Sequence, residues 1–194
     1  MNSDPDLNCT EGEPVRYWID ALDRLVEVND AWNIFAVENG AAELTRDRVL
    51  GQPIWRYVSD QTTQELYRSL IAVARESKHI EFVYRCDTPA LKRLMQMTIT
   101  PENSRVVCFQ SAVASVTVQK QHALWDPRQV RSGGAIRTCS WCKRLEIGGR
   151  WTELDTAVDV LGLFTEAPLP PVTQVTCPSC YESITLLAES TPKL

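Results

Sequence analysis

Two pairs of cysteines, Cys139-Ser-Trp-Cys142 and Cys177-Pro-Ser-Cys180, are the residues best suited to chemistry in this chain of 194 residues. One Cys-x-x-Cys pair serves either as a redox dithiol or as half of a metal site. A redox dithiol needs one pair, usually beside a βαβ pattern that this sequence lacks. Two pairs provide the four soft ligands of a tetrahedral zinc ion. We therefore predict that Cys139, Cys142, Cys177 and Cys180 bind one structural Zn²⁺.

The residues around each pair indicate how the pairs are positioned. Thr152-Glu-Leu-Asp155 is typical of a helix start, and Gly162 would end that helix. Pro178 suits the first position of a second helix, so the second pair lies at a helix N-terminus and the first pair on a turn. This layout predicts a small treble-clef-like zinc module. Four thiolates leave no open coordination position, which favours a structural over a catalytic metal.

Residues 15–118 show the patterns of an α+β domain. Apolar side chains alternate in the segments expected to be strands, and helical spacing is clearest after Asp60. We expect two strands, then helices, then three antiparallel strands, which together make a five-stranded antiparallel sheet with helices on one face. The segments expected to form these strands are Val15–Ile19, Leu25–Val28, Ile80–Cys86, Met95–Ile99 and Arg105–Val118.

Two sequence segments in this region resemble segments of PAS domains. Leu25-Val-Glu-Val-Asn-Asp-Ala-Trp-Asn-Ile-Phe35 is similar to the passage from the second PAS strand into the first helix, and Glu81-Phe-Val-Tyr-Arg-Cys-Asp87 resembles a hairpin of many bacterial PAS sequences. The first hairpin departs from the pattern, because Asp23-Arg24 stands where a glycine is usual. The resemblance implies a sensor or interaction domain, a small-molecule ligand of unknown identity, and a possible homodimer.

The C-terminal block resembles a module of bacterial signalling proteins, through Cys139-Ser-Trp-Cys-Lys-Arg144, Gly149-Arg-Trp151 and the second cysteine pair. The usual His-Gly before that pair is Gln174-Val175 here, so four thiolates are the simplest ligand set. The resulting division is a disordered N-terminus (1–13), a PAS-like domain (14–120), a linker (121–137) and a zinc-binding module (138–190). A short helix is expected to continue over Val116–Leu124.

Aromatic and sulfur-containing side chains of the PAS-like domain can line a ligand pocket, although a filled core is the alternative. The candidates are Trp32, Phe35, Trp55, Tyr84, Met97 and Phe109, with Tyr57 and Met95 as further members. Heme is not expected, because His79 and His122 are interpreted as exposed loop residues. Flavin is not expected either, since no reactive-cysteine motif is present. Cys86 and Cys108 are interpreted as buried, inert thiols.

Composition narrows the class of function. The net charge is −5, without a basic stripe, so nucleic acid is not the expected partner. No apolar run is long enough to span a membrane, no signal peptide is recognisable, and a cytoplasmic location is expected. We predict a regulatory signalling protein, not an enzyme, that acts through a partner protein. A nucleic-acid-associated transcriptional regulator and a thiol redox switch that releases zinc remain the alternatives.

Overall fold

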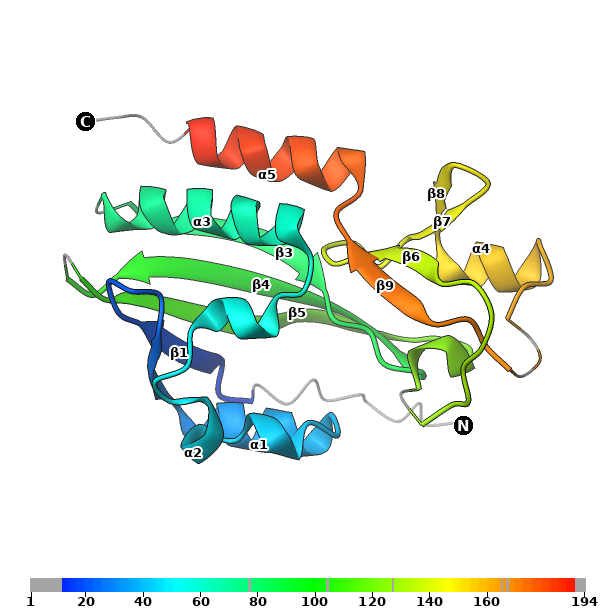
Figure 1. Cartoon of the computed structure of the whole chain (residues 1–194), viewed down its shortest axis with the longest axis horizontal. Helices are drawn as coiled ribbons and strands as arrows, with labels where there is room; N and C mark the ends of the chain where they lie inside the picture. The colour runs from blue at the N-terminus through cyan, green and yellow to red at the C-terminus, as the bar shows by residue number, and fades with distance from the viewer. Residues whose placement is uncertain are drawn as a thin grey trace, which may run out of the picture.

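The computed structural model describes residues 12–76, 78–103, 105–126, 128–164, 166 and 168–190. Most of the N-terminus predicted to be disordered (1–13) lies outside the described residues. Five strands form one antiparallel sheet in the order β2-β1-β5-β4-β3 (Figure 1). They are β1 (Val15–Ile19), β2 (Leu25–Val28), β3 (Ile80–Arg85), β4 (Leu91–Pro101) and β5 (Val107–Val118). The predicted five-stranded antiparallel sheet is confirmed.

Three α-helices lie between the second and third strands. They are α1 (Asp30–Glu38), α2 (Arg46–Val49) and α3 (Gln61–Arg75), with 3₁₀ turns at Ala42–Leu44 and Ile54–Tyr57. The apolar side of α3 (Leu66, Leu70, Ile71 and Ala74) is buried in one cluster with inward residues of the sheet. Because that cluster also contains Val49 and Ile54, the helical segment covers one face of the sheet, as predicted.

Alternation along the strands decides which side chains face the helices. Phe82 of β3 is paired with Met97 of β4, and Tyr84 with Met95, so all four residues lie on one face of the sheet. Ring stacking continues this face into the centre of the sheet, where Tyr17 lies on Phe109 with centroids 4.7 Å apart. Aromatic rings therefore form much of the helix-facing side.

The β1–β2 hairpin turns without a glycine, through Asp23-Arg24. Asp23 takes a φ of 59°, a left-handed conformation that aspartate tolerates better than most residues. The Asp20 carboxylate accepts hydrogen bonds from the backbone N–H groups of Leu22 and Arg24, at 2.8 and 2.9 Å. Arg75 of α3 then pairs with Asp23 at 2.8 Å. These side-chain interactions of Asp20 and Asp23 therefore stabilise the turn without a glycine.

The C-terminal part contains a second sheet that the sequence patterns did not predict. Its order is β8-β7-β6-β9, and β6 and β9 are parallel. The expected helix over Val116–Leu124 is wrong, because β5 runs on to Val118 and only a 3₁₀ turn follows at Ala123–Trp125. The remaining elements are β6 (Ile136–Cys139), β7 (Leu145–Ile147), β8 (Arg150–Thr152), α4 (Leu154–Asp159), β9 (Val172–Val175) and α5 (Pro178–Ser190).

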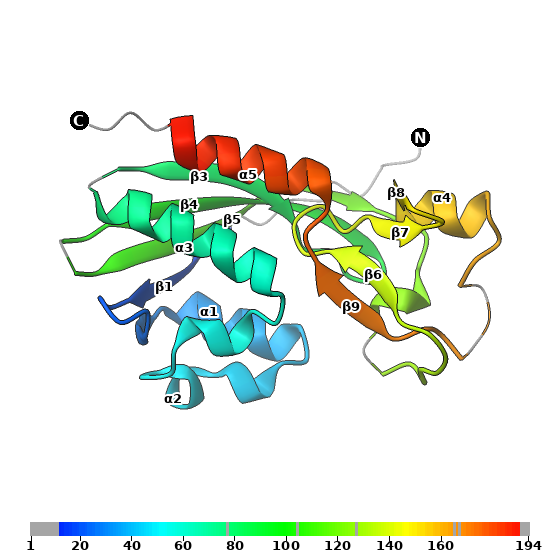
Figure 2. The same ribbon diagram turned by 45° about the horizontal axis from the view of Figure 1, so that its top comes forward.

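Helix α5 packs beside α3 (Figures 1 and 2). Ile184 of α5 is buried in the same cluster as the sheet and α3. Helix α5 is therefore joined to the core of the large sheet. None of the described helices has the length and apolar character needed to cross a membrane.

Candidate metal centre

Parallel pairing of β6 and β9 brings the two cysteine pairs together. Cys139 is the last residue of β6 and lies opposite Val175, the last residue of β9. Parallel strands end at the same edge of a sheet, so the first pair starts where β6 ends and the second follows two residues after β9. The predicted cysteines are thus placed together although 34 residues (143–176) separate them.

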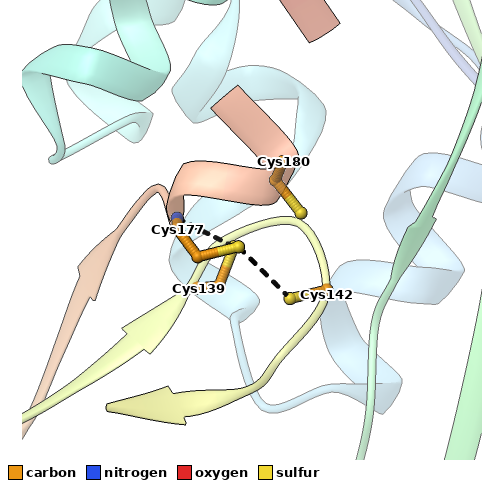
Figure 3. Close-up of side chains that lie close together, drawn as sticks. All are labelled: Cys139, Cys142, Cys177 and Cys180. Atoms are coloured by element: carbon orange, nitrogen blue, oxygen red, sulfur yellow. Dashed lines mark hydrogen bonds between the residues drawn. The ribbon is translucent and has the colours of Figure 1, made fainter. Parts of the chain in front are cut away.

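The four sulfur atoms point toward one another (Figure 3) and all lie within 4.8 Å of one another. The Sγ atoms of Cys142 and Cys177 are 3.8 Å apart. A tetrahedral site with Zn–S bonds of about 2.3 Å requires S–S separations of about 3.8 Å. The same distance is far too long for a disulfide, whose sulfurs are about 2.05 Å apart. The spacing therefore fits a tetrahedral thiolate site.

Backbone hydrogen bonds hold the first pair in a tight turn. The N–H of Cys139 donates to the carbonyl of Arg144 at 2.8 Å, and the N–H of Lys143 donates to the carbonyl of Cys139 at 3.0 Å. Lys143 takes a φ of 61°, which reverses the chain immediately after Cys142. A non-glycine residue in this region is strained by about 1–2 kcal/mol. The turn's hydrogen bonds hold that conformation.

The second pair opens α5. Pro178 is the first helical residue, where its missing N–H costs nothing, and the N–H of Tyr181 donates to the carbonyl of Cys177 at 2.9 Å. The positive end of the helix dipole therefore faces the sulfurs of Cys177 and Cys180. The backbone N–H of Cys177 also donates to Sγ of Cys139 at 3.4 Å. Both effects favour thiolates, as predicted for a pair at a helix N-terminus.

The electrostatics of the cluster favour a thiolate at Cys139, while hydrogen bonds with Cys139 raise the pKa values of Cys142 and Cys180. Hydrogen bonds from the Cys142 and Cys180 thiols hold the pKa of Cys139 well below its ordinary value. Cys139 and Cys177 are 0% and 2% exposed, whereas Cys142 and Cys180 are half-buried. A soft, closed set of four sulfurs is the donor set that Zn²⁺ prefers in structural sites. The residues present therefore fit the predicted ion.

The spacer of the first pair enters the core between the large sheet and α3. Trp141 is 4% exposed, stacks on Tyr67 of α3 with centroids 5.0 Å apart, and meets Phe82 of β3 edge-on at 5.3 Å. The N–H of Arg85 donates to the Trp141 carbonyl at 2.7 Å. Sequence reasoning missed this role, although a tryptophan between two metal ligands was the available signal. The cysteine cluster is thus part of the central core.

Hydroxyl groups add a second connection between α3 and the cysteine pairs. Asp60 caps α3 by accepting from the N–H and Oγ1 of Thr63, at 2.8 and 2.7 Å. Thr176 donates from Oγ1 to the same carboxylate at 3.3 Å and accepts from Nε1 of Trp141 at 3.2 Å. The start of α3 therefore contacts Thr176, the residue before Cys177, and Thr176 in turn contacts Trp141, the residue before Cys142.

A cavity of about 290 Å³ lies between the sheet, α1 and α3. Of the predicted pocket residues, Trp32, Phe35, Tyr84 and Met97 line it, together with Met95. Trp55 and Phe109 do not line it: Trp55 lies under Arg68, whose guanidinium carbon is 3.8 Å from the ring centroid, and Phe109 is fully buried against Tyr17. The other lining residues are Val15, Tyr17, Ala36, Asn39, Ala41, Leu44, Tyr67 and Ser111.

The two histidines differ in burial. The side chain of His79 is 55% exposed beside Glu81, as expected for a loop histidine. The same interpretation of His122 is wrong, because that side chain is 3% exposed and its Nε2 lies 2.6 Å from Oδ1 of Asp155. Tertiary packing of α4 against the end of β4, where Lys92 also pairs with Asp155, covers His122. Cys108 is buried as predicted, and Cys86 is half-buried.

A second ion-pair group joins the two parts of the chain at the end of β3. Arg85 pairs with Asp87 and also with Glu153, the latter at 2.6 Å, and Arg144 pairs with Glu153 at 3.0 Å. Burial alone would raise the pKa of Glu153, but hydrogen bonds from Arg85 and Arg144 outweigh it and lower the pKa. Sequence reasoning did not identify this group, because its members are far apart in the chain.

Comparisons with known proteins give distant matches only. No protein-family model matches the chain, and no curated protein matches it significantly. The PAS domain of Bordetella pertussis BvgS is similar over 53% of this chain and 77% of its own, with 20% identity and a TM-score of 0.40. A sensory box sensor histidine kinase from Vibrio cholerae is similar over 55% and 86%, with 8% identity and a TM-score of 0.40.

Proposed function

We propose that this chain is a non-enzymatic regulatory protein in which a PAS-type sensor or interaction domain is joined to a structural zinc centre and acts through a partner protein. One observation carries the proposal: Cys139, Trp141 and Cys177 belong to the same buried cluster as the sheet and α3. Bound zinc would fasten the C-terminal part onto the helix-covered face of the sheet. A structural metal so placed makes the packing of the two parts depend on the ion.

The residues of this chain would hold the ion as follows. Cys139 and Cys142 bind it from the turn after β6, and Cys177 and Cys180 bind it from the first turn of α5. Zinc supplies cross-linking without redox chemistry, and four thiolates leave no site for a substrate. The Cys177 N–H favours the thiolate of Cys139, the helix dipole favours those of Cys177 and Cys180, and the bound cation would hold all four sulfurs deprotonated. Thiolate ligands require a reducing compartment, which supports a cytoplasmic location.

Metal analysis of the purified protein tests the zinc centre. We expect one zinc per chain, bound tightly enough to survive dialysis without chelator. A metal-free protein with a Cys139–Cys142 disulfide would contradict the proposal. Separately, co-purification with a cross-linker would identify the partner protein, and nucleic-acid binding at moderate salt would favour the alternative of a transcriptional regulator.

The cavity between α1, α3 and the sheet is the proposed sensory site. Its lining is mainly apolar, and its polar groups include the Tyr84 and Ser111 hydroxyls, which share a 2.7 Å hydrogen bond, and the Asn39 amide. An apolar small molecule with one hydrogen-bonding group suits such a lining. Mass spectrometry of the protein under native conditions tests this site, because a retained ligand adds a defined mass. An absorption spectrum of the purified protein separates heme or flavin from a colourless ligand.

A further inference from the structure

We propose that the metal centre and the cavity are coupled through the stacked pair Trp141–Tyr67, so that binding of zinc sets the shape of the cavity wall. This inference rests on the proposed zinc centre. Tyr67 is the shared residue: its ring stacks on Trp141 at 5.0 Å with the planes 22° apart, and the same side chain lines the cavity. One aromatic ring therefore contacts the spacer of the first cysteine pair and the proposed sensory site.

The backbone of Trp141 has little conformational freedom once Cys139 and Cys142 bind the metal, because Trp141 lies in the turn between them. Trp141 lies directly before Cys142 and two residues after Cys139, so fixing the two sulfurs fixes the path of its backbone. Its carbonyl accepts from Arg85 at 2.7 Å and its indole N–H donates to Thr176 at 3.2 Å. Release of the sulfurs would free this turn, and the indole ring would no longer be held against α3.

The route from Trp141 to the cavity is short. Trp141 also meets Phe82, and Phe82 is paired with Met97, which lines the cavity. Tyr67 lies 6.4 Å from Phe109, and Phe109 stacks on Tyr17, another lining residue. Core side chains are close-packed, so a displaced indole forces a response from its neighbours. The cavity wall on the α3 side is therefore expected to change shape when the turn is released.

Coupling between two sites is reciprocal. If bound zinc favours the cavity shape that accepts a ligand, an occupied cavity must also favour bound zinc by the same factor. The device would give a cytoplasmic regulator two inputs, thiol or metal status and a small molecule, that converge on one arrangement of α3 and α5. Helix α5 begins at the second cysteine pair and packs on α3, so both inputs would be transmitted to the same pair of helices.

Methionine methyl groups provide the test. The chain has three methionines, and two of them, Met95 and Met97, line the cavity. The full-length protein would be labelled with carbon-13 at the methionine methyls, and its spectrum recorded with bound zinc and after removal of zinc by a chelator. We expect the Met95 and Met97 signals to shift on removal. In Trp141→Leu, which keeps all four cysteines, we expect that shift to be lost.

Trp125→Leu is the matched control, because Trp125 packs against the separate cluster of Leu124, Leu145, Leu154 and Ala157. It should keep the wild-type response. Unchanged Met95 and Met97 signals after metal loss would overturn the coupling. An equal response in wild type, Trp141→Leu and Trp125→Leu would also overturn it, and so would an equal response that global unfolding causes. A protein that binds no zinc at all would instead contradict the proposed zinc centre, and metal analysis distinguishes that result from a failure of the coupling alone.

Discussion

Thr63 in the first turn of α3 and Thr176, the residue before Cys177, share a hydrogen bond of 2.8 Å between their hydroxyl groups. This contact joins positions 113 residues apart in the sequence. It links the first turn of α3 to the residue before the second cysteine pair. This link, the ion pairs of Glu153 and the buried tyrosine rings each predict a measurable effect on stability.

Replacing a cysteine of the cluster should remove the metal. In Cys180→Ser, a hydroxyl replaces a soft ligand, and we expect most of the bound zinc to be lost. The free energy of unfolding should fall by roughly 4 kcal/mol or more, the range of losses seen when a structural metal is removed. Metal analysis and urea unfolding measure the two effects. Cys108→Ala, which changes a buried cysteine outside the cluster, should keep the full zinc content.

Removing the N-cap of α3 should weaken both the helix and its contact with the cysteine region. Asp60→Ala deletes the carboxylate that accepts from Thr63 and Thr176, and we expect a loss of roughly 1–2 kcal/mol in unfolding free energy. Loss of this supporting contact should also lower zinc affinity, by up to about tenfold, in chelator competition. Gln61→Ala, an exposed change one residue further on, is the control and should alter stability by less than about 0.5 kcal/mol.

The ion pairs of Glu153 should make part of the stability sensitive to acid. Its pKa in the folded protein is lower than the ordinary value of 4.5, so its contribution is present above pH 4.5 and is lost as the pH falls through the folded pKa. Glu153→Gln should therefore be less stable than wild type at neutral pH, by about 1 kcal/mol because the pair is partly exposed.

That stability difference should shrink as the pH falls below 4.5 and should vanish below the folded pKa, where the wild-type carboxylate is protonated in both states. Urea unfolding of wild type and Glu153→Gln at a series of pH values measures it. Glu166→Gln, which neutralises an exposed loop carboxylate, is the control and should track the wild type throughout. A difference that stays constant down to the lowest pH would show that the carboxylate charge contributes nothing.

Buried tyrosines should make the protein sensitive to alkali. Burial raises the pKa of Tyr84 to about 12, and burial also raises the pKa values of Tyr17 and Tyr67 above the ordinary value of 10.0. Their neutral forms stabilise the fold fully below pH 10, and that stability is lost as the pH rises toward the folded pKa values. Spectrophotometric titration of tyrosinate should show late ionisation of these residues in the folded protein.

Substituting the lining tyrosine isolates its contribution. Tyr84→Phe should remove one late-ionising group from that titration and lose about 1 kcal/mol through its missing hydrogen bond with Ser111. Titration in denaturant, where burial is gone, should return all five tyrosines of the chain to one early phase. Early ionisation of Tyr84 in the folded state would mean that water reaches its hydroxyl.

Local patterns were sufficient for most of the elements and for singling out the four cysteines that the structure brings together. Strand alternation in Ile80–Arg85, the cap at Asp60 and the proline at position 178 all act through neighbouring residues, so they can be recognised along the chain. The two Cys-x-x-Cys spacings likewise specify thiolate chemistry without knowledge of the fold. The short strands β6 to β9 were missed because three or four residues carry too little periodicity.

Relations between distant residues were decided only by the tertiary structure. Nothing in the order of residues places Trp141 on Tyr67, because stacking depends on how the turn after β6 packs against α3. Burial of His122 similarly requires α4 to approach β4, which no local pattern specifies. The spacing of the cysteines in the sequence indicates which ion the four sulfurs can bind, namely zinc. Only the packing of distant segments places those sulfurs in the same buried cluster as the large sheet and α3.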